Sequence, residues 1–464
     1  MLFSSLEFLY VFLPITVLVY FLAPRRIKNS VLLGASLLFY AVGEPVYLFL
    51  MLTVIAANFL FGFLVDKWRH SKKVCKITLA SAVATNILLL GFFKYYDPMA
   101  TAIPFLSPLG IALPLGISFY SFQALSYVVD VYRKDVRRAS SILKFSTYVS
   151  FFPQLVAGPI VRYSDVDEAL DKRNHSFSLA ADGLRRFLAG LSKKVLLANV
   201  AGEMFERMCL MGRYDNTVFG AWLGILFFAF QIYFDFSGYS DMAIGLGKIF
   251  GFDFPENFNY PYISRSATEF WRRWHITLSS FFREYVYIPL GGNRRGKLRT
   301  YLNLLVVWSL TGIWHGASMN FLFWGLYYFL VLSLEKAFLL KILEKIPTFF
   351  SHLYAILITL VGWVIFSADT LEGGALPYLS RMFGVGATEF FGGSDAYELI
   401  RNIPLLLIMI FASTPLPKKI FTRFFKTEDL PTALVTDALC LCALLLCTAR
   451  LVASGYNPFL YFRF

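Results

Sequence analysis

The sequence predicts an all-α polytopic membrane protein, and three observations support this. Of its 464 residues, 57% are apolar and only 16% are charged. Soluble proteins carry about 25% charged residues, so this chain has too few polar side chains to cover a folded surface in water. The apolar residues form long uncharged runs, and the basic residues gather mostly between these runs.

The uncharged runs approach the length that is needed to cross a membrane. A bilayer core about 30 Å thick requires about 20 helical residues. Two of the runs are roughly double that length, and a shorter run lies at residues 30–43, so we predict roughly eleven transmembrane helices. The runs are 8–23, 45–65, 77–93, 98–129, 145–161, 216–234, 300–334, 346–368, 402–417 and 432–449, the last interrupted by Asp437.

The net charge of +13 is explained by where the basic residues lie. In a soluble protein this excess would suggest nucleic acid, but in a membrane protein it marks cytoplasmic loops. The basic loops 25–28, 67–76 and 133–144 are separated by two predicted crossings each, which puts all three in the cytoplasm. A fourth lies at 418–426, and one crossing follows it. Both chain ends are therefore predicted outside, and no nucleic acid partner is expected.

Two further features concern the membrane surface and metal binding. Residues 177–208 alternate apolar and basic positions at helical spacing, which is typical of a helix lying at the cytoplasmic interface. The five cysteines show neither CxxC nor zinc-site spacing, so we expect no disulfide framework and no metal site.

His315 stands apart among the five histidines. It lies in the segment TGIWHGAS within an uncharged run, where a titratable side chain is costly unless it lines a cavity. Gly312 and Gly316 flank it and permit a break in the helix and a close approach of backbone or ligand. We interpret His315 as a candidate catalytic residue. The alternative is a histidine whose hydrogen bonds are satisfied by a neighbouring helix.

A second candidate segment, residues 271–296, is rich in basic and aromatic side chains. Amphipathic anchoring at the cytoplasmic face accounts for most of its pattern. The other interpretation, about equally supported by composition, is a phosphate-rich donor that meets arginine, because guanidinium groups bind phosphate through two parallel hydrogen bonds. The candidate residues are Trp271, Arg272, Arg273, Trp274, His275 and Asn293.

Two carboxylates, Asp235 and Asp241, lie in or beside the apolar segment QIYFDFSGYSDMAIG. Buried carboxylates need partners, and we expect Arg272 or Arg273 to pair with them. A catalytic acid is the less favoured interpretation. Both residues are candidates for the substrate site.

Together these motifs resemble those of the membrane-bound O-acyltransferases. The segments are FFPQLVAGPIVR, YFDFSGYSDMAIG, PENF, RRWHITLS, YIPLGGNRRG and GIWHGAS. The resemblance treats residues 1–464 as one membrane domain with a motif core at about 114–335. The turn IPLGGNRRG and the chain length favour the branch that contains alginate and peptidoglycan O-acetylation proteins. The D-alanyl transferase of the teichoic acid pathway belongs to the same superfamily.

The resemblance implies a ring of helices around a central funnel, with additional re-entrant and interfacial helices. His315 corresponds to the invariant histidine of the family, with Trp314 beside it in the motif, and His275 corresponds to the second family position. The implied donor is acetyl-CoA delivered from the cytoplasm, with no permanently bound cofactor. The implied acceptor lies outside the bacterial cytoplasmic membrane.

The last residues, NPFLYFRF, resemble a short aromatic C-terminal motif of related acylation systems, in which a tyrosine is proposed to carry the acyl group. The matching residue is Tyr461. An extended tail from Ser454 to Phe464 spans up to about 35 Å, enough to fold back into a pocket in the outer half of the membrane. The alternative is an aromatic belt at the interface.

We therefore expect an O-acetyltransferase that modifies an extracytoplasmic cell-envelope polysaccharide of the alginate or peptidoglycan type. His315, kept neutral by burial, is the expected general base. An acetyl group on Tyr461 would pass to an outer SGNH-type acetyltransferase partner. The alternatives are D-alanyl or other acyl transfer to a teichoic acid-type polymer, a transporter, and a scaffold for a partner enzyme.

Overall fold

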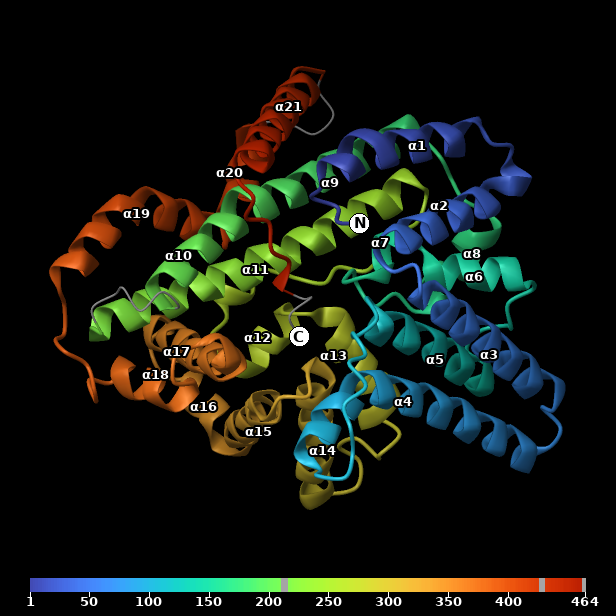
Figure 1. Cartoon of the computed structure of the whole chain (residues 1–464), viewed down its shortest axis with the longest axis horizontal. Helices are drawn as coiled ribbons and strands as arrows, with labels where there is room; N and C mark the ends of the chain where they lie inside the picture. Colours follow the sequence, from blue (N-terminus) through green and yellow to red (C-terminus); the bar gives the residue numbers. More distant parts are fainter. Residues whose placement is uncertain (210–215, 425–429, 461–464) are drawn as a thin grey trace. The chain divides into compact units, whose positions relative to one another are not determined.

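The computed structural model describes residues 1–209, 216–424 and 430–460, and all regular secondary structure in these residues is helical (Figure 1). Contacts between residues divide the chain into two compact units. The first unit contains Met1–Leu191 and Tyr239–Glu256, and the second contains Ser192–Gly238 and Asn257–Phe464. Each unit is described separately below.

The first unit is built mainly from nine helices that precede residue 192. It also contains residues 239–249 of the long helix α11 (Val218–Ile249). Its helices are α1 (Leu13–Leu22), α2 (Lys28–Gly43), α3 (Tyr47–Lys67), α4 (Lys72–Ala102), α5 (Ile117–Arg133), α6 (Ile142–Ser150), α7 (Phe152–Leu155), α8 (Tyr163–Asp171) and α9 (Phe177–Ser192), with short helical turns η1 (Phe8–Phe12) and η2 (Arg25–Ile27).

The second unit contains the remaining helices and the first part of α11. These are η3 (Lys193–Ala198), α10 (Asn199–Cys209), η4 (Pro261–Ile263), α12 (Ala267–Arg273), α13 (Ile276–Phe282), η5 (Arg283–Tyr287), α14 (Lys297–His315), α15 (Met319–Leu334), η6 (Glu335–Leu339), α16 (Leu340–Leu343), α17 (Thr348–Phe366), η7 (Ala368–Thr370), α18 (Ala375–Met382), α19 (Gly393–Ala412), α20 (Leu416–Phe424) and α21 (Leu430–Ala453).

Five helices in the described residues are long and apolar enough to cross a membrane, by length and composition. A sixth span is possible if α19 and α20, which are bent by 75° at a short break, count as one. The membrane character is thus supported, whereas the predicted count of roughly eleven is not reached. The five are α3, α4, α11, α17 and residues 431–453 of α21.

Four of the predicted runs do not form single long helices, and one of them is run 402–417, which the bend between α19 and α20 interrupts. Run 98–129 contains the end of α4, a non-helical stretch rich in proline and glycine, and then α5. Run 145–161 folds into the short helices α6 and α7, whose residues are almost all buried in the protein. Run 300–334 divides into α14 and α15. Its division at His315 agrees with the break predicted from the flanking glycines.

The first unit is held together by aromatic packing and by a buried amide pair. Phe8, Phe12 and Phe152 are in contact, with the rings of Phe12 and Phe152 5.4 Å apart and edge to face. Edge-to-face pairs add attraction beyond the apolar area that they bury. Asn58 of α3 and Asn86 of α4 exchange two hydrogen bonds of 2.8 and 3.1 Å. This exchange satisfies both buried amides and fixes α3 against α4.

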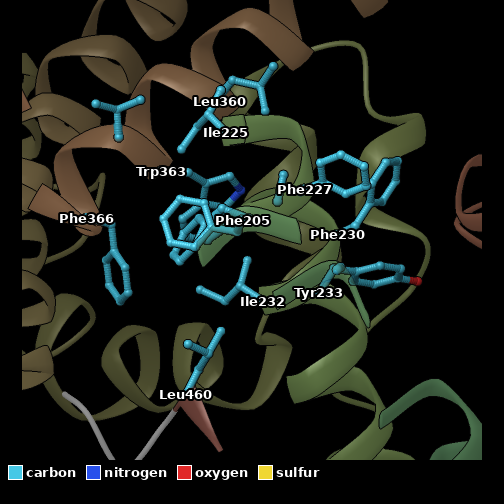
Figure 2. Packing of buried hydrophobic residues seen from close by; sticks show 14 of the residues in the cluster. Phe205, Ile225, Phe227, Phe230, Ile232, Tyr233, Leu360, Trp363, Phe366 and Leu460 are labelled. Carbon is cyan, nitrogen blue, oxygen red and sulfur yellow. The ribbon is translucent and has the colours of Figure 1, made fainter. Parts of the chain in front are cut away.

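The second unit has a large aromatic core around α11 and α17. Trp363 and Phe366 of α17 belong to it, as does Ile232 of α11. Figure 2 shows that Leu460, from the end of the chain, joins the same cluster as Ile232. The last described residue of the C-terminal tail therefore lies in the core of this unit.

Helices α14 and α15 lie side by side and approach closely through glycines (Figure 1). A methyl group added to Gly325 would lie 2.3 Å from the backbone oxygen of Trp308. One added to Gly312 would lie 2.3 Å from the backbone oxygen of Phe321. Because backbone atoms cannot move aside like flexible side chains, these two glycines set the spacing of the helices.

We expect Gly325→Ala to lower the free energy of unfolding by about 1 to 3 kcal/mol, because the added methyl group forces α15 away from α14. Thermal unfolding of the purified protein in detergent measures the change. Gly34→Ala in α2 is the matched control, since a methyl group there meets nothing within 4 Å. Equal melting temperatures for the Gly325 variant and the wild type would contradict the proposed spacing role.

Candidate functional site

His315 is the last residue of α14 and stands at the turn that leads into α15. Gly316 continues in an extended conformation, which carries the chain away from the helix. The imidazole is partly buried among aromatic rings and meets Trp324 and Phe366 edge to face at 5.1 and 5.2 Å. A methyl group on Gly316 would lie 2.3 Å from the Phe321 ring. The glycine thus permits the close packing that was predicted for this break.

His315 lines a small cavity of about 30 Å³, which we call the tail cavity. Its volume corresponds to about one water molecule of the liquid, so it has no room for a nucleotide. Its walls are formed by residues of α11, α14, α15 and α17, by Trp274 between α12 and α13, and by the C-terminal tail. The lining residues are Ile232, Asp235, Phe236, Trp274, His315, Trp324, Trp363, Phe366, Phe459 and Leu460.

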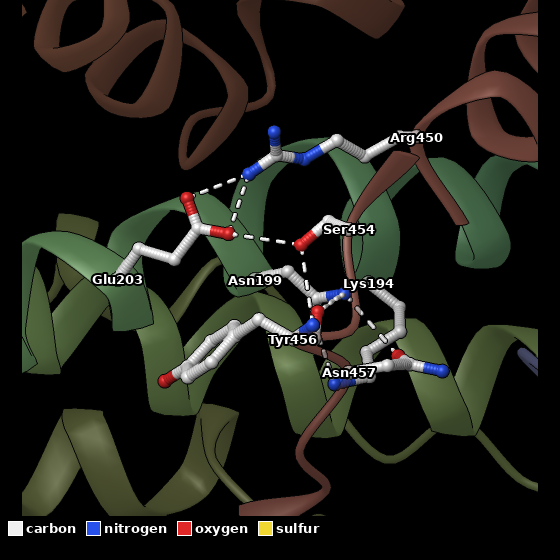
Figure 3. A network of polar contacts seen from close by, with 7 residues as sticks. All are labelled: Lys194, Asn199, Glu203, Arg450, Ser454, Tyr456 and Asn457. Carbon is white, nitrogen blue, oxygen red and sulfur yellow. Dashed lines mark hydrogen bonds and ion pairs between the residues drawn. The ribbon is translucent and has the colours of Figure 1, made fainter. Parts of the chain in front are cut away.

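The C-terminal tail is tied to η3 and α10 after it leaves α21 (Figure 3). Arg450 binds the Glu203 carboxylate at 2.5 and 2.6 Å. Asn199 donates hydrogen bonds to the Tyr456 carbonyl at 3.3 Å and to Asn457 Oδ1 at 3.2 Å. These contacts direct residues 454–460 along α10.

A buried ion pair holds the end of the described tail beside His315. Lys194 Nζ lies 2.8 Å from Asp235 Oδ1, and both side chains are 3% exposed. Lys194 also donates to Asn199 Oδ1 at 2.8 Å and to the Pro458 carbonyl. The backbone N–H of Leu460 donates to Asp235 Oδ2 at 2.9 Å. Residues 456–460 are thus bound through their own backbone, and the predicted Tyr461, the next residue, lies outside the described residues.

His275 occupies the junction between α12 and α13 and is almost completely buried. Its backbone is left-handed, with φ 43°, a conformation that is uncommon for residues other than glycine and often found at functional sites. Its Nδ1 lies 3.1 Å from Asn257 Oδ1. Thr277 donates to the same oxygen through its hydroxyl, at 2.9 Å, and through its backbone N–H.

This network fixes the chemical state of His275. Because Asn257 Oδ1 accepts both hydrogen bonds from Thr277, the proton in the contact with His275 belongs to Nδ1. Burial lowers the pKa of His275 to about 3, so the ring is neutral near pH 7. Its Nε2 then carries a lone pair, and this atom has no hydrogen-bond partner among the described residues. His275 can therefore accept a hydrogen bond from a bound molecule.

His275 lines a second and larger cavity of about 390 Å³, which we call the basic cavity. Three cationic side chains, Arg272, Arg283 and Lys336, contribute to its wall. Arg272 is exposed and has no hydrogen-bond or ion-pair partner in the part of the chain that the structure describes. Asn293 lies near this cavity and accepts hydrogen bonds from Tyr287 and, at 3.4 Å, from Lys336.

Aromatic side chains separate the two histidines. The Trp314 ring lies 4.9 Å from the His315 ring and 6.1 Å from the His275 ring. Phe236, which lines the tail cavity, lies 4.7 Å from the His275 ring. The two cavities are therefore neighbours whose walls share aromatic contacts, with one histidine lining each.

The remaining predicted residues divide between cavity walls and structural contacts. Trp271 lines the basic cavity and Trp274 the tail cavity. Arg273 differs from its neighbour Arg272, because it binds Glu269 at 2.9 Å and the Asn259 carbonyl at 3.0 Å. These bonds give Arg273 a structural role in α12.

A family model for the membrane-bound O-acyltransferase family matches residues 78–368, which is more than half of the chain. The chain belongs to the membrane-bound O-acyltransferase family. A Pseudomonas putida protein named "probable alginate O-acetylase" is 37% identical, and the match covers 100% of both chains. The Helicobacter pylori peptidoglycan O-acetyltransferase is 35% identical over 88% of this chain and 85% of its own. The Bacillus subtilis teichoic acid D-alanyltransferase is 27% identical over 55% and 67%.

Membership in the acyltransferase family confirms two predictions. The protein is an acyltransferase, which decides against the transporter and scaffold alternatives. It is also a multi-pass membrane protein, in agreement with its apolar helices.

The predicted partners of the two carboxylates were wrong. Asp235 pairs with Lys194, and Asp241, in the first unit, pairs with Arg186 at 2.6 Å. Both carboxylates are paired with basic side chains, as predicted. Arg273, however, forms its ion pair with Glu269. Glu269 lies four residues earlier on the same helix, a spacing that brings the two side chains together.

Sequence reasoning missed Asn257, which contacts the His275 ring, and Lys194, which pairs with Asp235 and holds the tail. For Lys194, the amphipathic pattern of residues 177–208 predicts a basic position at the membrane surface, and its observed burial depends on where the tail lies. Asn257 lies within the segment PENF, which was noted as a motif without a role. An amide side chain beside Phe258 in this motif, 18 residues before His275, is the one signal that could have identified it.

Proposed function

We propose that this acyltransferase moves an acetyl group from cytoplasmic acetyl-CoA to the C-terminal tail and then to an extracytoplasmic polysaccharide. The observation that carries the proposal is the course of the tail. Residues 459 and 460 line the cavity of His315, and the Leu460 backbone is bound by Asp235. The next residue along the chain is Tyr461, the expected carrier.

The basic cavity is the proposed site of the donor. Its volume and its three cationic side chains suit the phosphate groups and the pantetheine arm of a coenzyme A thioester. His275 lines this cavity, and its Nε2, which is buried in this structure, is proposed to accept a hydrogen bond from an N–H or O–H group of the donor. It is unsuited to stabilising an oxyanion, because it carries no proton.

His315 is the proposed general base. It takes the proton from the Tyr461 hydroxyl while the phenolic oxygen bonds to the carbonyl carbon of the thioester. The bond between this carbon and sulfur then breaks, and the coenzyme A thiolate leaves as a thiol with the proton from His315. An acetyl ester of Tyr461 remains.

A second transfer completes the reaction outside the membrane. A hydroxyl of an SGNH-type partner attacks the tyrosyl ester, its proton passes to the tyrosine oxygen, and the partner then acetylates the polymer. The relatives named for alginate and peptidoglycan O-acetylation support a polysaccharide acceptor. The relay requires the C-terminal tail to begin on the outer side of the bacterial cytoplasmic membrane. It also removes the need to carry a polar nucleotide through lipid.

Peptide mass spectrometry after incubation with isotopically labelled acetyl-CoA tests the proposal. We expect one labelled acetyl group on Tyr461 in the wild type and none in Tyr461→Phe. Tyr456→Phe is the matched control, since it removes a tail tyrosine whose carbonyl, and not its hydroxyl, is held by Asn199. Polymer acetylation by Tyr461→Phe at the wild-type rate would overturn the relay. A label supplied by D-alanyl thioester instead of acetyl-CoA would reassign the donor.

A further inference from the structure

Three cationic side chains and one histidine gather in the first unit, apart from the residues discussed above. Arg25 belongs to η2, and Lys28 is the first residue of α2. Arg173 and His175 lie in the loop that joins α8 to α9. We call these four residues the cationic cluster.

Lys28 is unusual for a lysine because it is buried, with 8% of its surface exposed. Its ammonium lies over the rings of Tyr20 and Phe21, 4.5 and 5.3 Å from their centres. It has no hydrogen-bond or ion-pair partner within the described ranges. A buried charge without a partner is costly, so an anion would stabilise this arrangement.

Arg173 supplies a second incompletely satisfied cation at the same place. Its guanidinium lies over the rings of Tyr20 and Phe252, and one nitrogen donates to Asn29 Oδ1 at 2.6 Å. The other terminal nitrogen, Nη1, is buried and has no partner in the described chain. Lys28 and Arg173 thus both lie against the Tyr20 ring.

The electrostatic environment of the cluster is positive. Burial lowers the pKa of Lys28, and the charges of Arg173 and Arg25 lower it further. Burial also lowers the pKa of His175, and Lys28 and Arg173 add to this shift. The first turn of α2 contains no acidic residue to offset these charges, and a helix N-terminus is itself favourable to anions.

The neighbouring surface of α1 is apolar and open. Phe21, whose ring centre lies 5.3 Å from the Lys28 ammonium, is 42% exposed, and its neighbour Leu22 is 76% exposed. Their exposure beside a cationic group is the combination that suits a phospholipid, whose acyl chains are apolar and whose head group is anionic. We propose that the cationic cluster binds the phosphate group of an anionic phospholipid, with Lys28 and Arg173 as its main ligands and the acyl chains against α1.

The test compares melting temperatures in nanodiscs of phosphatidylcholine and in nanodiscs that also contain phosphatidylglycerol. We expect the anionic lipid to raise the melting temperature of the wild type. Lys28→Met and Arg173→Gln should each weaken lipid binding at least about tenfold and lose this rise. Arg26→Gln, an exposed neighbouring arginine outside the cluster, should keep it. In phosphatidylcholine alone, Lys28→Met should be as stable as the wild type or more so.

Two results would count against the proposal. An equal response to phosphatidylglycerol in Lys28→Met, Arg173→Gln and Arg26→Gln would exclude the cluster as the site. A full rise with inorganic phosphate in phosphatidylcholine nanodiscs, lost in Lys28→Met, would keep the phosphate site and overturn the lipid as its source.

Discussion

Replacing His315 by alanine is expected to lower acetyl transfer by about 10² to 10⁴-fold, the usual contribution of a general base. A tyrosine or sugar hydroxyl is a weak nucleophile until a base accepts its proton. Among the described residues, His315 is the one histidine that lines the tail cavity, where the end of the described tail lies. The measurement is release of coenzyme A thiol from acetyl-CoA by the purified protein in the presence of its partner and polymer.

The matched control for His315 is His352→Ala in α17. His352 lies 3.0 Å from the Ser264 carbonyl and lines neither of the two cavities. This variant is expected to retain most of its activity. Thermal unfolding of both variants separates loss of chemistry from loss of fold. If His315→Ala keeps wild-type turnover with an intact fold, the base assignment is wrong.

The sequence predicted the long membrane helices because side chains that face lipid are apolar, and this produces long uncharged runs. Helices α3 and α17 follow uncharged runs closely, and α4 contains run 77–93. For run 145–161 the same inference is wrong. This run is apolar because it is buried within the protein, where it forms the short helices α6 and α7. Burial in protein and burial in lipid select the same residues. The number of crossings therefore could not be obtained from run length.

The sequence predicted those parts of the candidate site that depend on neighbouring residues in the chain. The glycines beside His315 and the aromatic and basic residues beside His275 are local signals, and the structure places both histidines at breaks between helices. The ion pair between Arg273 and Glu269 is also a local contact, because the two residues are four apart on α12. The ion pair between Lys194 and Asp235 is not local, because it joins η3 to α11, and so the sequence did not predict it.

Replacing Lys194 by methionine is expected to lower the free energy of unfolding by about 3 to 5 kcal/mol, because it leaves the Asp235 carboxylate buried without its counter-ion. Lys194 and Asp235 are each 3% exposed, so solvent cannot replace the lost charge. The tail should also lose its position, since Lys194 holds the Pro458 carbonyl and Asp235 holds the Leu460 N–H. Thermal unfolding in detergent and protease sensitivity of a C-terminal tag measure the two effects.

The double variant Lys194→Met with Asp235→Asn separates the fold from the tail. Removing both charges together should restore most of the stability, since no uncompensated charge remains and asparagine still offers an oxygen to the Leu460 N–H. The contact between Lys194 and Pro458 remains absent, so we expect acetyl transfer to stay well below the wild-type rate. Full activity in the double variant would show that Lys194 contributes only to the fold and not to the position of the tail. Wild-type stability in Lys194→Met would contradict the buried ion pair itself.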